Sequence, residues 1–345
     1  MVVVVKCNNG IVTDRYLELI GDSLKNDKYG DVKYVSCYKD VLRYQKNSIV
    51  IVARIMDAMP LLCRGYNNMI MWFQGIEPEE SYMSHHSKSR MKILSMLEKY
   101  ILKKAVFKFF TSKEMLLHYE KKYGLTIEKG TYYCMPCLNT SIHPMSFKAK
   151  CKYENNYFAY VGSMAVWQKF EETVMLYKEI EQLRMPNTKF FVFTGDKIKA
   201  AEILKEHDVD NYSIEFVPNE ELPKALEAIK YGFIVREDTA VNRVATPTKI
   251  STYLSCGLIP IYSACLKDFE RIAQKMNYAI CCDKLMKKKI LDFNDRTIDP
   301  SSVFNEYNEI FDTYYSEKKH SKHIKQLLSE KIYVTGKPPV PSLNP

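Results

Sequence analysis

The sequence predicts an α/β protein with two Rossmann-like domains, whose parallel sheets face each other across a cleft. Short β-branched or aromatic runs alternate with helical segments, and this alternation restarts near the middle of the chain. With 345 residues, of which 46% are hydrophobic, the chain has enough material for two cores. Strands that alternate with helices indicate βαβ units and a parallel sheet, whose ligands bind beyond the carboxyl ends of the strands.

In the first half, short apolar runs have the length and composition of buried strands. The expected strands are Val2–Lys6, Val32–Val35, Ser48–Ala53, Met69–Phe73, Ala105–Phe110 and Tyr132–Met135. The expected helices are Asp14–Leu24, Arg90–Lys104 and Ser112–Tyr123. In the second of these helices, apolar residues recur at three- and four-residue steps, which is the spacing of one helix face.

The second half repeats the same rhythm after the polar stretch Lys148–Asn156, which we interpret as a linker. Its expected strands are Tyr157–Val161, Lys189–Thr194, Ser213–Val217, Gly232–Val235, Leu258–Tyr262 and Tyr278–Cys281. Its expected helices are Lys169–Arg184, Ile198–His207, Glu220–Ile229, Thr248–Ser255 and Leu266–Lys275. We therefore expect domains over residues 1–148 and 157–300, and helices with a tail over 301–345 that pack back on the first domain.

Composition excludes several classes of protein. No apolar run approaches the roughly 18 residues of a membrane span, and the first strand is too short for the core of a signal peptide. The ten cysteines form no evenly spaced framework, so we expect free thiols and a cytoplasmic location. Cys134 and Cys137 form a CxxC without a second ligand pair, and we interpret them as two thiols at a strand end. The net charge of +9 favours anionic partners such as nucleotide phosphates, lipid headgroups or nucleic acid.

Spaced blocks in the second half carry a resemblance to a known family. They are YVGSMAVWQK at 160–169, FVFTGD at 191–196, VPNEEL at 217–222, FIVRED at 233–238, NRVATPTK at 242–249 and YLSCG at 253–257. These blocks resemble the C-terminal domain of retaining glycosyltransferases of family 4 and its bacterial polysaccharide-biosynthesis relatives. FQGIEPEE at 73–80 and MPCLN at 135–139 fit the N-terminal domain of the same family. The resemblance implies the GT-B fold, a nucleotide-sugar donor bound to the C-terminal domain, and a saccharide or lipid-linked acceptor on the N-terminal side.

A donor diphosphate needs backbone N–H groups and cations. Gly162 and Ser163 stand where a strand turns into a helix, so their amides can meet a phosphate at a helix N-terminus. Lys169 lies seven residues after Gly162 and would add positive charge. Thr248 and Lys249 open a second helix in the same fashion. We expect all five residues to surround the donor phosphates.

Three charged residues, Arg236, Glu237 and Asp238, follow a fully apolar strand. The resemblance implies that Glu237 contacts sugar hydroxyls, and that Arg236 or Arg243 contacts the phosphates or an acidic sugar. The expected catalytic residues are Glu237, Arg236 and Lys249.

The resemblance also indicates where the base and the acceptor bind. The base would be held mainly by backbone and packing. The residues expected to hold it are Gly195, Val217 and Leu222. On the acceptor side, the segment that follows the strand Met69–Phe73, with the polar residues Gln74 and Glu79 or Glu80, should border the cleft. The residues expected on this side are Gln74, Gly75 and Glu79.

Several positions depart from the family pattern. Ser163 stands where members often have arginine. The usual loop lysine aligns with Gln168, or with Lys169 if the loop is one residue longer. Val244 and Thr252 stand where many members carry two glutamates. Glu237 is the candidate to take over one of their roles.

The implied reaction is a retaining transfer in which cations stabilise the leaving diphosphate. Asp208 and Asp210 match the DxD signature of metal-dependent glycosyltransferases, but they lie in a helix-to-strand loop at the wrong end of the sheet. We therefore expect no metal and no cofactor, with the nucleotide sugar as co-substrate.

Two other functions stay open. The first is a basic nucleic-acid-binding protein, although no RNA or DNA motif is present and the basic residues are spread over both halves. We expect no nucleic-acid partner. The second is a sugar-nucleotide epimerase of the GT-B fold, which requires acid and base groups that converge in the cleft.

A basic segment in the first half suggests weak association with anionic membranes, and hence a peripheral location at the inner face of the membrane. Only Glu98 opposes its positive charges. The basic residues are Lys88, Arg90, Lys92, Lys99, Lys103, Lys104 and Lys108. The alternative is that the apolar stripe of this helix faces the core and the lysines form a solvated face.

Overall fold

A computed structural model describes residues 1–6, 11–25, 31–138 and 140–335. Asn139 and residues 336–345 of the expected tail lie outside the described residues. Contacts divide the chain into two compact units: unit 1 consists of Met1–Pro136 with Ser316–Pro345, and unit 2 of Cys137–Tyr315. The domain boundaries predicted from the sequence lie at residues 148, 157 and 300.

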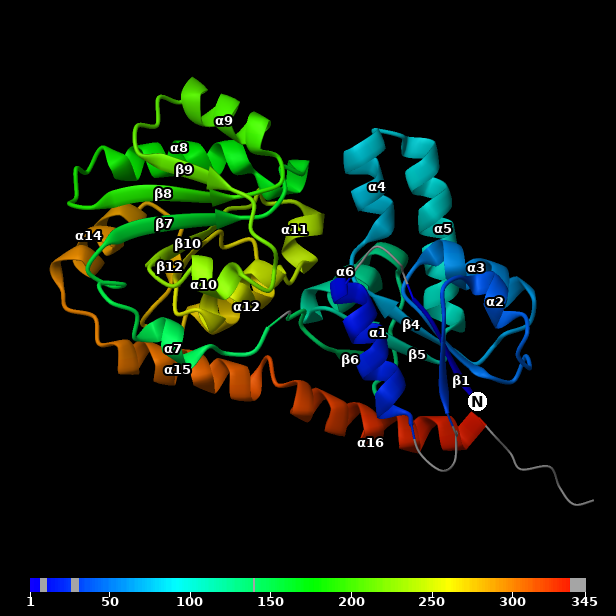
Figure 1. Ribbon diagram of the computed structural model, residues 1–345. Coiled ribbons are helices and arrows are strands. Elements are labelled where there is room, and N and C mark those ends of the chain that lie inside the picture. Colours follow the sequence, from blue (N-terminus) through cyan, green and yellow to red (C-terminus); the bar gives the residue numbers. More distant parts are fainter. Residues whose placement is uncertain (7–10, 26–30, 139, 336–345) are drawn as a thin grey trace, which may run out of the picture. The chain divides into compact units, whose positions relative to one another are not determined.

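Two C-terminal helices belong to different units (Figure 1). Helix α15 (Pro300–Thr313) packs in unit 2, where the Tyr307 hydroxyl donates to the backbone oxygens of Leu258 and Tyr278. Helix α16 (Glu317–Thr335) packs in unit 1, where its His320 ring contacts the hydroxyl of Tyr133 at 2.7 Å.

Unit 1 contains a six-stranded parallel sheet in the order β2-β1-β3-β4-β5-β6. The strands are β1 (Val2–Val5), β2 (Val32–Val35), β3 (Ile49–Val52), β4 (Met69–Phe73), β5 (Phe107–Phe110) and β6 (Tyr132–Cys134). The other helices are α1 (Ile11–Ser23), α2 (Tyr38–Val41), α3 (Ile55–Cys63), α4 (Glu77–His85), α5 (Lys88–Lys104) and α6 (Lys113–Tyr123). Every residue of β1, β3, β4 and β5 is buried, as expected for inner strands of a parallel sheet.

The sequence analysis did not predict α3 and α4. Helix α3 carries Pro60 inside it, and α4 begins with Glu77 and Pro78 and shows little apolar periodicity. Proline is common in the first turn of a helix. At later positions it usually ends a helix, so it makes a helical segment hard to recognise from the sequence. These two helices follow β3 and β4 and so carry the residues beyond the carboxyl ends of those strands.

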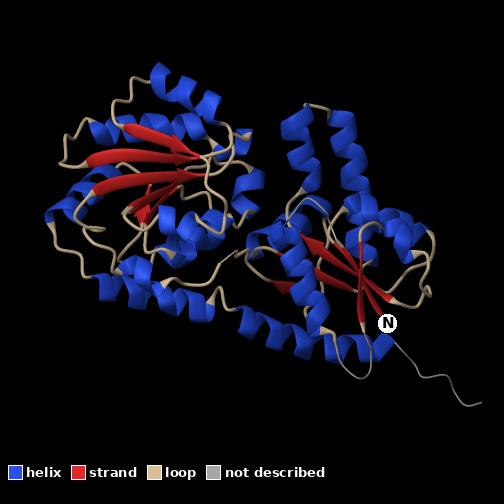
Figure 2. Cartoon of the chain, viewed as in Figure 1, coloured by secondary structure: helices blue, strands red, loops and turns tan. Residues whose placement is uncertain are grey.

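Unit 2 contains a second six-stranded parallel sheet, in the order β12-β11-β10-β7-β8-β9. Its strands are β7 (Asn156–Val161), β8 (Thr188–Phe193), β9 (Tyr212–Glu215), β10 (Tyr231–Ile234), β11 (Ile259–Tyr262) and β12 (Ile280–Cys281). Its remaining helices are α7 (Pro144–Phe147), η1 (Val166–Gln168), α8 (Phe170–Glu181), α9 (Lys197–Glu206), α10 (Leu222–Ala225), α11 (Ala240–Val244), α12 (Thr248–Ser255), α13 (Lys267–Ala273) and α14 (Met286–Asp295). Figure 2 shows helices on both faces of each sheet. The prediction of two Rossmann-like α/β domains is confirmed.

The stretch Lys148–Asn156, interpreted above as a linker, is instead part of unit 2. Lys152 is only 1% exposed, and its ammonium donates to the backbone oxygens of Leu226 and Glu227 at 3.2 and 3.0 Å. Polar side chains of this stretch make buried hydrogen bonds. Composition alone cannot tell a polar residue that is buried and hydrogen-bonded from one that is exposed to solvent.

Every cysteine that the structure describes carries a free thiol, and burial raises the pKa of Cys137 to about 11. No helix within the described ranges is long and apolar enough to cross a bilayer.

Candidate functional site

The strand order of unit 2 reverses at the pair β7 and β10. Strands β8 and β9 extend from β7 on one side, and β11 and β12 extend from β10 on the other. Connections leaving the carboxyl ends of two such strands diverge, and ligands bind in the resulting crevice. Gly162 follows β7, and Arg236 follows β10 after one residue, so both start from this point of the sheet.

Lys249 reaches the same point from the first turn of α12. Its side chain is only 8% exposed, and its Nζ lies 4.0 Å from the centroid of the Tyr160 ring on β7. The Lys249 Nζ has no hydrogen-bond partner among the described residues. Burial, followed by the positive charge of Arg236, holds the pKa of Lys249 well below its usual value. An unpartnered buried ammonium is costly, so it indicates a position completed by an anion.

Gly162 allows this lysine to approach the backbone. Its φ of +143° is a conformation that side-chain-bearing residues rarely adopt. A Cβ on this residue would lie 2.8 Å from Cε and 2.9 Å from Nζ of Lys249. The glycine is therefore required both by the turn and by the ammonium that packs over it.

Arg236 is a second buried cation, also 8% exposed. Its Nη1 donates to the backbone oxygens of Gln168 and Val235 at 3.1 and 3.2 Å, and burial lowers its pKa. The Gln168 Oε1 is buried and has no partner within the part of the chain that the structure describes. Arg236 and Lys249 thus form a concentration of positive charge in which Arg236 donates to backbone oxygens and Lys249 has no hydrogen-bond partner among the described residues.

Lys169 differs from Lys249 because its ammonium is already paired with carboxylates. Its Nζ lies 2.8 Å from Glu172 and 3.2 Å from Glu237. The hydrogen bonds that Lys169 donates to Glu172 and then to Glu237 raise the pKa of Lys169. The side chain of Glu237 is 56% exposed, so its carboxylate can meet both this lysine and a ligand.

The remaining predicted phosphate contacts are more peripheral. Arg243 is exposed and donates to both carboxylate oxygens of Asp238 at 2.5 and 2.9 Å. Ser163 is exposed, and its backbone oxygen accepts from the Tyr160 hydroxyl at 2.6 Å. Thr248 is half-buried as the first residue of α12. The structure therefore gathers Gly162, Lys249 and Arg236, and it pairs Arg243 elsewhere.

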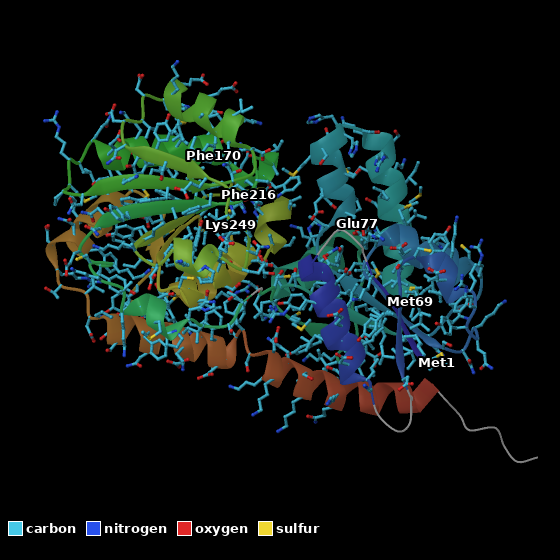
Figure 3. The ribbon with its side chains drawn as sticks, viewed as in Figure 1. Met1, Met69, Glu77, Phe170, Phe216 and Lys249 are labelled. Carbon is cyan, nitrogen blue, oxygen red and sulfur yellow. The ribbon has the colours of Figure 1, made fainter. Side chains whose placement is uncertain are left out.

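The predicted base-binding residues follow β8 and β9, next to β7 in the sheet. Gly195 is exposed, and a Cβ there would lie 3.9 Å from Phe216. Phe216 is 62% exposed; it lies on the same side of unit 2 as Lys249 in Figure 3. Val217 is half-buried, and Leu222 is a buried core residue that contributes packing. The sequence analysis placed Phe216 inside a strand, whereas β9 ends one residue earlier and leaves the aromatic ring exposed.

The predicted acceptor-side residues lie in unit 1 after β4. Gln74 is exposed, and its side-chain oxygen accepts from the Thr13 hydroxyl at 2.6 Å. Gly75 packs against Glu80 so closely that a Cβ would lie 2.1 Å from its Oε1. Only Gln74 of these residues is both polar and exposed.

Glu79 is held inside unit 1. Its carboxylate lies 2.8 Å from Lys122 and 3.4 Å from His118, both on α6. Burial acts to raise the pKa of Glu79, but the neighbouring His118 and Lys122, of which Lys122 donates to Glu79 at 2.9 Å, prevail and lower it. Lys122 also bonds Glu98, which is 1% exposed. Glu79 therefore stabilises the packing of α4 on α6.

Glu77, at the start of α4, is the carboxylate of this region whose titration is most displaced. Its Oε1 accepts from the backbone N–H of Ile55 at 3.0 Å, at the N-terminus of α3. Burial, with smaller contributions from Glu98 and Glu80, raises the pKa of Glu77 to about 7; the Ile55 N–H and Arg54 act against this shift.

We expect Glu77→Gln to change the pH dependence of stability. An unfolded glutamate titrates near pH 4.3, so between this value and about pH 7 the native state retains a proton that the unfolded state releases. Stability attributable to Glu77 therefore falls as pH rises through this window. The amide keeps the acceptor for Ile55, so the variant should match the parent near pH 4 and exceed it by about 1–3 kcal/mol at pH 8.

Urea unfolding at both pH values measures this difference. Glu79→Gln is the matched control, because the lowered pKa of Glu79 predicts the opposite sign: a loss of stability at neutral pH. A Glu77→Gln variant less stable than the parent at pH 8 contradicts the assignment.

The DxD-like pair lies at the amino end of β9, away from the crevice. Asp208 has a φ of +49°, and Asp210 is 86% exposed with a carboxylate oxygen 3.5 Å from Lys178. No group of three or more potential metal ligands occurs within the described ranges. Metal independence stays a prediction.

Comparison with known proteins extends the fold assignment. No protein-family model matches the chain, and no curated protein matches it in sequence. Among solved structures, it resembles S. aureus TarM in complex with fondaparinux, alpha-GlcNAc-glycerol and UDP, with 12% identity over 86% of this chain and a TM-score of 0.59. It also resembles the alpha,alpha-trehalose-phosphate synthase (UDP-forming) from Burkholderia vietnamiensis, with 8% identity over 86% of this chain and a TM-score of 0.60.

A third similar structure is the pneumococcal O-GlcNAc transferase GtfA in complex with UDP and GlcNAc, with 12% identity over 86% of this chain and a TM-score of 0.53. The chain spans 58% of the TarM and GtfA chains and 77% of the synthase chain. At these identities the likeness concerns the fold, and together with the two parallel sheets it shows that the chain has the GT-B fold of glycosyltransferases.

Proposed function

We propose that this protein is a glycosyltransferase that moves a sugar from a nucleotide-sugar donor to a saccharide or lipid-linked acceptor, in polysaccharide or glycoconjugate biosynthesis. The observation that carries the proposal is the buried ammonium of Lys249 at the switch point of the unit 2 sheet, which has no hydrogen-bond partner in the described part of the chain. A diphosphate would complete it. The solved structures that name UDP make UDP-sugars the first donors to test.

Each part of the donor has a candidate site in unit 2. Lys249 and Arg236 would bind the diphosphate, together with the backbone at Gly162 and Ser163. The base would stack on Phe216 beside Gly195, since exposed aromatic rings bind bases through their faces. Glu237 would hold the sugar hydroxyls while Lys169 orients its carboxylate.

The reaction would break the bond between the anomeric carbon and the diphosphate oxygen and form a bond to an acceptor oxygen on the same face of the sugar. The acceptor proton would pass to the leaving phosphate. Two fixed cations in a site of low polarity stabilise the charge that develops on the diphosphate, and this preorganised stabilisation is commonly the largest catalytic contribution. Gln74 is the candidate acceptor contact in unit 1. We also propose that the enzyme is located in the cytoplasm.

A nucleotide-sugar panel tests this proposal directly. Thermal unfolding with UDP-, GDP- and ADP-sugars, and with single-stranded RNA, shows which ligand binds the native state. Release of the nucleoside diphosphate and analysis of the sugar distinguish transfer from epimerisation. Stabilisation by a nucleotide sugar, with slow release of nucleoside diphosphate, supports the proposal. Stabilisation by RNA alone, or conversion of the sugar without release of the diphosphate, contradicts it.

We expect Glu237→Gln to lower sugar transfer by about tenfold or more without weakening the affinity for the free nucleoside diphosphate, because loss of a charge-assisted hydrogen bond costs about 1.5–3 kcal/mol. Kinetics with the donor and calorimetry with the nucleoside diphosphate measure the two effects. Glu172→Gln is the matched control, since Glu172 also pairs with Lys169 but lies in the first turn of α8. Equal losses for both ligands would assign Glu237 to the nucleotide or to folding.

Activity should persist in EDTA, because cations of the protein would take the place of a metal at the diphosphate. The measurement is the initial rate of transfer after dialysis against EDTA, with and without added Mg²⁺ or Mn²⁺. A rate that vanishes on chelation and returns with either ion contradicts metal-independent transfer.

A further inference from the structure

Helix α5 presents exposed apolar side chains on its outer face. Ile93, Met96 and Tyr100 are 54%, 58% and 43% exposed, and their steps of three and four residues place them on one side of the helix. The opposite side is buried: Ile101 and Leu102 are 0% and 3% exposed. The alternative interpretation, in which the apolar stripe of this helix faces the core, is therefore only partly correct, since Ile93 is exposed.

The same outer surface carries positive charge. The exposed basic residues of α5 are Lys88, Arg90, Lys92, Lys103 and Lys104. Lys104 lies 5.9 Å from the ring centroid of Tyr100, so a cation and an exposed aromatic ring stand next to each other. Lys108, counted with this group in the sequence analysis, is instead buried in β5 at 8% exposure.

The one acidic residue of the helix faces inward. Glu98 is 1% exposed and accepts hydrogen bonds from Tyr119, Lys122 and Tyr123. Its negative charge is therefore directed to α6, away from the lysines. Helix α5 also packs against α3 and α4 inside unit 1, where α4 and α5 stand side by side (Figure 1).

We infer that this face of α5, defined by Ile93, Met96 and Tyr100 with the flanking cations, docks on the surface of an anionic lipid bilayer. Apolar and aromatic side chains that protrude between lysines match the boundary between headgroups and acyl chains. If this were only a solvated helix face, the lysines would be explained but the exposed apolar side chains would not. A nucleic-acid-binding surface likewise does not explain why Ile93 and Met96 are exposed. The inference does not rest on the proposed transferase activity.

The test is co-sedimentation of the full chain with phosphatidylcholine vesicles that contain or lack phosphatidylglycerol, at low and high salt. We expect binding that requires the anionic lipid and weakens with salt. Lys103→Gln with Lys104→Gln should reduce binding about ten- to thirtyfold, because a lysine near an anionic surface contributes about 1 kcal/mol. Ile93→Ser with Met96→Ser should reduce it about fivefold or more, through lost apolar burial.

Matched variants in unit 2 control for net charge and surface polarity. Lys284→Gln with Lys288→Gln removes the same charge from exposed positions, and Met175→Ser with Leu285→Ser replaces side chains that are 50% and 56% exposed. Both should bind vesicles as the parent does. Binding that ignores lipid charge, losses of equal size in the control variants, or RNA that binds more tightly than the vesicles through Lys103 and Lys104 would overturn the inference.

Discussion

Lys249→Met is expected to lower kcat/KM for the nucleotide sugar by about 10²–10³ and at the same time to stabilise the protein. Loss of one preorganised group that stabilises developing negative charge typically has a kinetic effect of this size. The stability gain follows because the buried ammonium has no hydrogen-bond partner within the residues that the structure describes. Methionine has a similar length and no charge to desolvate. A gain of about 1–3 kcal/mol in the free energy of unfolding is expected.

The gain should depend on pH with a definite sign. The lowered pKa of Lys249 means that the native state binds its proton less readily than the unfolded chain, where lysine titrates near 10.4. The cost of the charged lysine is present in full below its lowered native pKa, and it disappears as pH rises toward the unfolded value. The free energy of unfolding, measured with urea, should therefore be higher for the variant than for the parent, and this difference should be largest at neutral and acidic pH.

Lys152→Met separates this effect from burial as such. Lys152 is also buried in unit 2, and burial lowers its pKa to about 7, but its ammonium donates to two backbone oxygens. Methionine at this position orphans both acceptors and should destabilise the fold. A Lys249→Met variant that loses stability as Lys152→Met does, or one that keeps full donor turnover, would show that Lys249 is structural.

Gly162→Ala is expected to impair the same site from the backbone side. The new Cβ would lie within 3 Å of Cε and Nζ of Lys249, and the residue would keep a φ of +143°. Displacement of the ammonium should lower donor kcat/KM by about tenfold or more. The left-handed backbone adds a destabilisation of about 1–3 kcal/mol.

A double-mutant cycle checks the physical cause. In the Lys249→Met background the collision is with a flexible neutral chain end, so the stability effects of the two substitutions should not add. Gly65→Ala is the matched control, because Gly65 also has a positive φ, of +89°, but a Cβ there would meet Cδ of Lys46 at an ordinary 3.8 Å, outside the candidate site. Additive effects in the cycle, or equal losses of turnover in the control, would show that the contact between Gly162 and Lys249 is unimportant.

The local pattern of the sequence predicts much of the fold. Buried strands such as Val2–Val5 and Met69–Phe73 are continuous apolar runs, and Thr248–Ser255 is a helix opened after a proline. These features depend on residues within one turn or one strand. Helix α3 and the buried segment around Lys152 were missed, because the first contains an internal proline and the second is stabilised by partners far along the chain.

For the candidate site, the sequence by itself determined the residue types and their strand ends: a glycine after β7, an arginine after β10 and a lysine that opens α12. The tertiary structure decided which cations remain available. Lys169 is paired with Glu237, a residue on a different βα connection, whereas Lys249 packs on Tyr160 and finds no hydrogen-bond partner across the described ranges. The physical reason is that the state of a charged group depends on how far it is buried and on which residues from distant strands lie next to it. Local periodicity in the sequence determines neither of these.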